Sequence, residues 1–113
     1  MAKTVLQGAF LVALLAGVLT VIGTFAPAQA QSFNCARAST PDEVLICQNP
    51  YLADLDEQMS SLYFSIRNRL SGNARRQIER DQKAWLEGRM RCGRDGPCIA
   101  DAYNRRITAL QYY

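Results

Sequence analysis

Four cysteines are the residues of this chain whose type and spacing point most directly to chemistry. They are Cys35, Cys47, Cys92 and Cys98. Zinc sites usually place cysteine pairs about two to four residues apart, and a redox-active pair usually has the form Cys-x-x-Cys. The chain has neither spacing and contains no histidine to complete a metal site. We therefore expect disulfides, with no metal and no cofactor.

Four cysteines allow three disulfide pairings. A helix that begins near Pro41 would bring Cys47 back toward the segment that contains Cys35, and Cys92 and Cys98 flank a predicted turn. Geometry therefore favours the local pairs Cys35–Cys47 and Cys92–Cys98. A Cys47–Cys92 bridge would constrain the unfolded chain more, but it needs two helix ends side by side. The local pairing and the pairing that contains a Cys47–Cys92 bridge both remain open at this point.

Residues for catalysis are scarce. The sequence lacks histidine, so a Ser-His pair cannot exist, and it has no Gly-x-Ser-x-Gly turn and no Gly-rich phosphate loop. Carboxylates cluster at Asp54, Asp56 and Glu57, near the start of a predicted helix, where negative charge stabilises the helix dipole. We predict that the protein is not an enzyme, and we keep these three residues as a candidate acidic surface for a partner.

The single tryptophan, Trp85, has Gln82 and Arg89 on the same helical face. A small domain needs its largest apolar side chain inside, so a role in the core is favoured over a ring that stacks on a ligand. Arg89 is also expected to pair with Asp56 from the preceding helix. This pair would be a structural contact.

The charge pattern argues against a nucleic-acid partner. The formal net charge is +3 at pH 7, with 13 basic and 10 acidic residues. Arg76, Arg80 and Lys83 share one helical face that could suit an anionic surface. Glu79 and Asp81 interrupt this face, so a solvated helix surface is favoured.

Residues 1–30 have the pattern of a secretory signal peptide. Lys3 precedes an uncharged, mostly apolar run over residues 4–26, which ends at Pro27-Ala28-Gln29-Ala30. This order of positive, apolar and Ala-x-Ala segments predicts cleavage after Ala30. The apolar run is also long enough to span a bilayer, so an uncleaved N-terminal anchor is the alternative.

Cleavage would leave a single domain of residues 31–113, located in the periplasm or secreted. The residues just before Cys35 lack the small side chains of a bacterial lipoprotein signal, so we expect no stable membrane anchor on this domain. A domain of 83 residues has a thin hydrophobic core. Disulfides would supply part of the stability that the core cannot.

Capping residues predict where the first two helices begin. Thr40, Pro41 and Glu43 form a predicted capping box that starts a short helix over residues 41–48. Asn49-Pro50 repeats the cap and proline and starts a long helix. Its apolar residues recur in steps of three and four and draw one stripe: Leu52, Leu55, Met59, Leu62, Ile66 and Leu70.

Two further helices follow. Ser71-Gly72-Asn73 predicts a tight turn before a helix over about 74–92, and Pro97 is placed to open a last helix that runs close to the C-terminus. The apolar faces of these two helices comprise Ile78, Trp85, Leu86 and Met90, and then Ile99, Ala102, Tyr103, Ile107 and Leu110. The predicted fold class is therefore all-α: a small disulfide-stapled bundle of three main helices plus a short N-terminal helix.

Spaced groups of residues form a series across most of this domain. The first group is Phe33-x-Cys35-Ala36-x-Ala38-Ser39-Thr40-Pro41-x-Glu43-x-x-Ile46-Cys47, and it is followed by Leu52-x-x-Leu55-Asp56. The later groups are Gln82-x-x-Trp85-Leu86-x-x-Arg89-x-x-Cys92 and Cys98-Ile99-x-x-Ala102-Tyr103-x-x-Arg106-Ile107. The series resembles the bacterial LprI-type lysozyme-inhibitor domain and covers nearly all of the chain after the leader.

This resemblance implies an exported, helical cell-envelope protein, and some members of the family inhibit lysozyme. We therefore expect a protein that binds and inhibits lysozyme or a related peptidoglycan hydrolase. The alternative is a non-inhibitory periplasmic module that binds another envelope protein or a cell-wall component. The sequence predicts no particular oligomeric state.

The segment Gly93-Arg94-Asp95-Gly96-Pro97 is a candidate for contact with the partner. Lysozyme cleaves glycans with two carboxylates in a cleft, so an inhibitor could occlude that cleft and donate hydrogen bonds to those acids. A Cys92–Cys98 bridge would hold Arg94 and Asp95 in a rigid display. An ordinary turn between helices is the simpler interpretation and is favoured.

Overall fold

The computed structural model describes residue 17 and residues 32–113, so the predicted leader of residues 1–30 lies outside the described residues except for Gly17. Within residues 32–113 there is no strand, and the all-α prediction is confirmed. The elements are a short 3-10 helix η1 (Cys35–Arg37) and the helices α1 (Pro41–Gln48), α2 (Pro50–Arg69), α3 (Gly72–Met90) and α4 (Gly96–Leu110).

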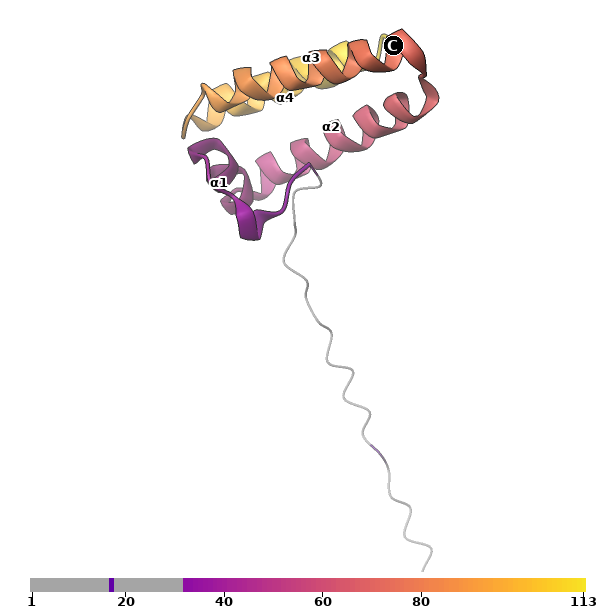
Figure 1. The fold of residues 1–113 in the computed structure, drawn as a ribbon. Coiled ribbons are helices and arrows are strands. Elements are labelled where there is room, and N and C mark those ends of the chain that lie inside the picture. The colour runs from indigo at the N-terminus through magenta and orange to yellow at the C-terminus, as the bar shows by residue number, and fades with distance from the viewer. Residues whose placement is uncertain (1–16, 18–31) are drawn as a thin grey trace, which may run out of the picture.

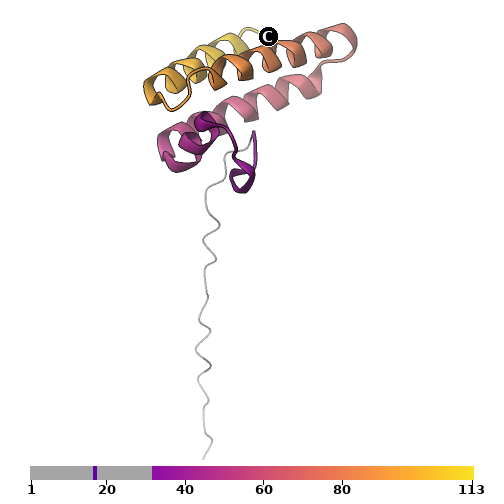
Figure 2. The ribbon, with the colours of Figure 1, turned by 60° about the vertical axis from the view of Figure 1, so that its left-hand side comes forward.

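The three long helices lie along one another, and α1 packs at one end of them (Figure 1). The chain reverses between α2 and α3, and α4 returns alongside α3, as the two views show together (Figures 1 and 2). α2 has its most extensive packing with α4 and then with α1. The predicted bundle of three main helices plus a short leading helix is therefore confirmed. No helix within residues 32–113 is both long and apolar enough to cross a membrane.

The caps are only partly as predicted. The side chain of Asn49 accepts hydrogen bonds from the backbone N–H groups of Tyr51 and Leu52 at 3.0 and 3.2 Å, which confirms the start of α2. The predicted capping box at α1 is wrong in detail. Thr40 is the N-cap residue but its side chain makes no capping hydrogen bond, and Glu43 accepts from the backbone N–H of Ser39.

Glycine is required at two turns. Gly72 has φ +56° at the start of α3, and Gly93 has φ +58° just after the end of α3. A side chain is disfavoured in this left-handed region, so each glycine lets the chain reverse over few residues. α3 begins at Gly72 and ends at Met90, about two residues earlier at each end than the sequence indicated.

The core follows the predicted stripe of α2 with two changes. Leu52, Leu55, Met59 and Ile66 are buried, whereas Leu62 and Leu70 are only half-buried. α4 contributes Ile99, Ala102, Tyr103 and Leu110, as predicted, and α3 contributes Ile78. Met90 is 48% exposed, so its predicted place on the apolar face of α3 is wrong. The inner positions of α3 are taken instead by Gln82 and Arg89, both buried.

Both disulfides have the local pairing. Cys35 is bonded to Cys47, and Cys92 is bonded to Cys98, with Cα–Cα distances of 5.8 and 5.7 Å. The first bridge ties η1 to α1, and the second closes the turn between α3 and α4. The competing Cys47–Cys92 bridge is excluded because all four sulfurs are already paired.

Candidate functional site

A buried arginine on α3 contacts residues of the other three α-helices. Arg89 of α3 is only 4% exposed, and its Nε donates to Asp42 of α1 at 2.9 Å. Its Nη1 donates to the hydroxyl of Tyr103 of α4 at 2.9 Å and lies 3.6 Å from Asp56 of α2. The predicted pairing of Arg89 with Asp56 is confirmed. Asp42 and Tyr103 are the partners that the sequence did not indicate.

Asp56 lies in the core and not on the surface. It is fully buried, and it accepts hydrogen bonds from the Tyr103 hydroxyl at 2.6 Å and from the backbone N–H and hydroxyl of Ser32 at 3.0 and 2.5 Å. The candidate acidic surface therefore loses its middle member, because a buried carboxylate cannot meet a partner. Asp54 and Glu57 are exposed.

Aromatic rings enclose the same guanidinium group. The Arg89 Cζ atom lies 5.5, 5.6 and 5.7 Å from the ring centroids of Phe33, Trp85 and Tyr103. A cation over an aromatic face is stabilised by the ring quadrupole, and the gain is larger where water is excluded. The rings and the two carboxylates together offset the cost of burying the positive charge.

The pKa values of this network are shifted by burial and by the neighbouring charges. Burial opposes ionisation of Asp42, but hydrogen bonds from Thr40 and Arg89 and the charge of Arg89 outweigh it and lower the pKa of Asp42. Burial, with the charge and hydrogen bond of Asp56, raises the pKa of Tyr103 far above its usual range despite the opposing charge of Arg89. The network therefore holds an ionised Asp42 and a neutral Tyr103.

A second polar chain crosses the core beside the first. Arg106 of α4 donates from Nε to Gln82 at 2.9 Å, and Gln82 donates to the sulfur of Met59 at 3.3 Å. Burial lowers the pKa of Arg106, partly offset by the charges of Tyr113 and Asp81. Sequence reasoning quoted Arg106 only within the family series and gave it no place in the core, although its spacing of three from Tyr103 and four from Leu110 puts it on the inner face of α4.

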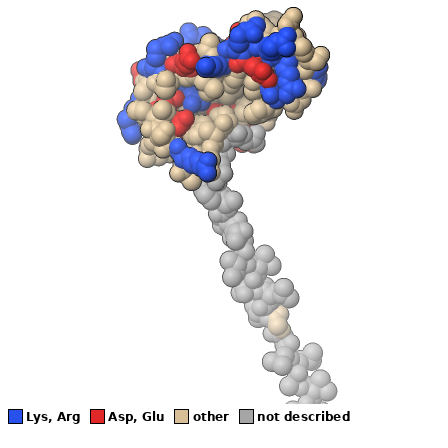
Figure 3. Space-filling view, viewed as in Figure 1, with Lys and Arg blue, Asp and Glu red and all other residues tan. Residues whose placement is uncertain are grey.

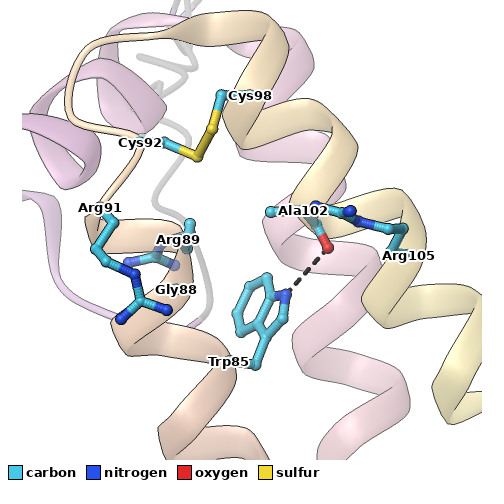
Figure 4. A pocket seen from close by; sticks show the side chains of 8 residues that line it. All are labelled: Trp85, Gly88, Arg89, Arg91, Cys92, Cys98, Ala102 and Arg105. Atoms are coloured by element: carbon cyan, nitrogen blue, oxygen red, sulfur yellow. Dashed lines mark hydrogen bonds between the residues drawn. A yellow bond between two sulfur atoms is a disulfide. The ribbon is translucent and has the colours of Figure 1, made fainter.

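Trp85 borders a groove between α3 and α4, at the end of the bundle closed by the Cys92–Cys98 bridge (Figure 4). The groove has a volume of about 370 Å³. The Trp85 Nε1–H donates to the backbone oxygen of Ala102 at 3.0 Å, and its ring centroid lies 5.2 Å from that of Tyr103. We call this cavity the Trp85 groove; its lining includes Trp85, Gly88, Arg91, Cys92, Ala102 and Arg105.

The groove changes the interpretation of Trp85. Its ring is half-buried, so the residue both packs on the core and presents one side to solvent. Arg91 extends from the α3 side and Arg105 from the α4 side in Figure 4. Two guanidinium groups beside an aromatic ring suit an anionic group that also carries apolar atoms.

The loop candidates have different roles. Arg94 is exposed, and among residues 32–113 it has no hydrogen-bond or ion-pair partner. Asp95 is exposed too, but its side chain accepts from the backbone N–H of Cys98 at 3.0 Å and caps α4. Asp95 therefore has a structural role at the start of the helix, whereas Arg94 is available for contact.

The basic side chains on the exposed face of α3 form hydrogen bonds with neighbours on the same helix. Arg76 donates to Asn73, and Arg80 donates to Gln77 at 2.7 Å. In Figure 3, acidic side chains stand between the basic ones on the upper helices. The visible face thus has no continuous field of one sign, which agrees with the interpretation as a solvated helix surface.

Comparisons with known proteins reveal one group of distant relatives. No family model matches the chain, and no solved structure matches it. Over 90 residues the chain is 28% identical to the proteins named Lipoprotein LprI from Mycobacterium tuberculosis (strains H37Rv and CDC 1551) and Mycobacterium bovis (strain AF2122/97). The similarity covers 77% of this chain and 44% of each relative, so the chain spans less than half of their length. The chain is thus distantly similar in sequence to mycobacterial lipoproteins of the LprI type.

Proposed function

We propose that this protein is exported to the cell envelope and there binds and inhibits lysozyme or a related peptidoglycan hydrolase. The observation that carries the proposal is the sequence similarity to the LprI lipoproteins, which covers 77% of the chain. The resemblance to the LprI-type lysozyme-inhibitor domain supports the same activity. Because the relatives are more than twice as long as the similar region, the activity is proposed here for the helical domain itself.

The scaffold is suited to rigid binding. Two disulfides and the buried Arg89 network hold its helix ends, so little conformational entropy would be lost when a partner docks. Arg94 stands exposed on the loop closed by Cys92–Cys98. Its guanidinium group can donate two parallel hydrogen bonds to a carboxylate, which is the group that lysozyme uses for catalysis.

Export is part of the proposal. Residues 1–30 would act as the signal peptide, with cleavage after Ala30. The two disulfides of the folded domain agree with an oxidising compartment. Mass spectrometry of the protein recovered from the envelope would test this point, since retention of residues 1–30 would contradict cleavage and support an anchor.

A muramidase assay tests the function directly. Excess purified exported protein should slow the hydrolysis of peptidoglycan by at least one lysozyme type, in proportion to its concentration. Unchanged hydrolysis across animal, insect and bacteriophage lysozymes would overturn the proposal. If a pulldown from envelope extract then recovered a different protein or cell-wall material, the non-inhibitory interaction module would take its place.

A further inference from the structure

We propose that the Trp85 groove is a binding site for a carboxylate side chain on an acidic segment of a protein partner. The proposal deepens the proposed function and rests on it in one respect, that the partner is a protein. It concerns Trp85, Arg91 and Arg105, to which sequence reasoning gave no binding role beyond the less favoured stacking by Trp85.

The first argument is the charge of the groove. Arg91 is exposed, and its side chain has no hydrogen-bond or ion-pair partner among residues 32–113. Arg105 is paired only with Asp101 at 2.9 Å, and the side chains are 76% and 62% exposed. An exposed pair of this kind contributes little, so an incoming carboxylate can replace Asp101. Arg89 also lines the groove, but Asp42 and Asp56 already neutralise it.

The second argument is the hydrogen-bonding capacity of the lining. Its polar side chains are the three arginines and Trp85, and all of these can only donate. The Trp85 N–H is already used by Ala102. A sugar hydroxyl needs an acceptor for its own proton, and no amide, hydroxyl or carboxylate side chain lines the groove to supply one. An ionised carboxylate is acceptor-only and matches this lining.

The third argument separates a side-chain carboxylate from a free inorganic anion. Beside the two guanidinium groups, the groove offers the Trp85 ring, the Cys92–Cys98 bridge and the methyl group of Ala102. These surfaces are apolar and gain from covering the methylene groups of Glu or Asp. Inorganic phosphate has no apolar atoms to place there. A carboxylate on an aliphatic stem is therefore the occupant that uses the whole groove.

The fourth argument is preorganisation. The Trp85 ring is fixed by its hydrogen bond to Ala102 and by packing on Tyr103, and the disulfide joins the two helices at the end of the groove. Gly88 lines the groove without a side chain, and a Cβ atom at this position would be in ordinary van der Waals contact with Nη2 of Arg91, 3.6 Å away. The site therefore exists before the ligand arrives, which reduces the ordering cost of binding.

The test uses the indole N–H of Trp85, which gives a unique signal in a nitrogen–proton correlation spectrum because the chain has one tryptophan. The probes are a soluble hexapeptide of Glu and Gly, its Gln and Gly counterpart, inorganic phosphate and a soluble peptidoglycan fragment. The acidic peptide should shift the signal in a saturable way. The amide peptide should not shift it, and phosphate should bind at least tenfold more weakly than the acidic peptide.

Matched variants assign the effect to the groove. Arg91→Gln/Arg105→Gln should weaken binding of the acidic peptide at least tenfold, about 1.4 kcal/mol. Arg76→Gln/Arg80→Gln removes the same charge from the first half of α3, outside the groove, and should leave binding nearly unchanged. Gly88→Gln adds a helix-favouring side chain at the wall and should also block binding without a change in charge. Equal effects of the two double variants would overturn the proposal, as would a shift with the peptidoglycan fragment alone.

The outcomes separate this proposal from the proposed function. If no lysozyme is inhibited but the acidic peptide binds in an Arg91- and Arg105-dependent way, the groove proposal stands and the inhibitory function fails. If lysozyme is inhibited equally by the wild type and by Arg91→Gln/Arg105→Gln, and this variant also retains binding of the peptide, the inhibitory function stands and the groove proposal fails.

Discussion

Arg89 on α3 donates from Nε to Oδ2 of Asp42 on α1 at 2.9 Å, across 47 residues of sequence, and both side chains are almost completely buried. This contact joins a helix of the disulfide-bonded N-terminal part to the helix that carries Trp85. Arg89 also lines the Trp85 groove, so the buried pair ties one side of the groove to α1.

Removal of either member of this pair should destabilise the protein. Arg89→Met leaves the buried charges of Asp42 and Asp56 without a partner and should lower the free energy of unfolding by about 3–5 kcal/mol. Asp42→Asn leaves Arg89 paired with Asp56 and should cost less, about 1–3 kcal/mol, for the charge-assisted hydrogen bond that is lost. Urea unfolding of the disulfide-bonded protein measures this. The exposed pair Arg105 and Asp101 is the control, and Asp101→Asn should cost less than about 1 kcal/mol. Equal costs for the two aspartates would contradict the buried network.

Asp42 should also make stability fall in acid. Its folded pKa lies below its usual value of about 3.9, so the unfolded state binds more protons at low pH. The stabilisation is present above about pH 4 and is lost as the pH falls through the folded pKa. Below about pH 4, the unfolding free energy of Asp42→Asn should therefore fall less steeply than that of the wild type. Parallel curves in urea titrations would rule out this contribution.

Tyr103 should act at the opposite end of the pH range. Its folded pKa is raised far above the usual value of about 10, so it stays protonated in the folded protein and ionises on unfolding. Stability is therefore lost as the pH rises above about 10. At about pH 11 the folded wild type and Tyr103→Phe should show the same tyrosinate absorbance. An excess of one tyrosinate in the wild type would show that Tyr103 ionises in the folded state.

The two disulfides should contribute unequally to stability. Loop-closure entropy predicts a loss of about 3 kcal/mol for Cys35→Ser/Cys47→Ser and about 2 kcal/mol for Cys92→Ser/Cys98→Ser. In a domain of this size each kcal/mol lowers Tm by roughly 4–8 °C. Calorimetry of the two variants measures the difference. If both variants melted at the wild-type temperature, the disulfides would not be needed to stabilise the thin core.

Arg94 should matter for inhibition and not for folding. Arg94→Gln removes an exposed charge, so the free energy of unfolding should change by no more than about a few tenths of a kcal/mol. Tm should therefore stay close to that of the wild type. Loss of a charge-assisted hydrogen bond to a lysozyme carboxylate should raise the inhibition constant about tenfold or more. Arg37→Gln, at an exposed position on η1, is the matched control and should inhibit like the wild type. Equal inhibition by both variants would remove Arg94 from the contact surface.

The sequence predicted the helices well because local signals set them. The Asn49 side chain caps α2 by accepting from backbone N–H groups only two and three residues further along the chain. Glycine at positions 72 and 93 allows the two positive φ angles. The stripe of α2 predicted its buried face for the same reason, since helical periodicity depends on spacing alone. The local disulfide pairing followed from the short distances that these helices impose.

The polar core was predicted only in part. The pairing of Arg89 with Asp56 was expected, but Asp56 was also kept as a surface residue, and Asp42, Tyr103 and Arg106 were not assigned to the network. Whether a charged side chain near a helix end is solvated or buried depends on what packs over it. Ser32 and Tyr103 cover Asp56, and they come from 24 and 47 residues away in the chain.

The sequence by itself determined the helical elements and the distant similarity to LprI lipoproteins, and it favoured the two local disulfides that the structure contains, because each depends on residue order and short-range geometry. Only the tertiary structure decided which charges are buried and that Trp85, Arg91 and Arg105 share a groove. The groove arises from the packing of α3 against α4, whereas the buried charges are covered by residues from all four α-helices and by Ser32. Burial and electrostatic pairing depend on neighbours in space, and the order of residues along the chain does not specify them.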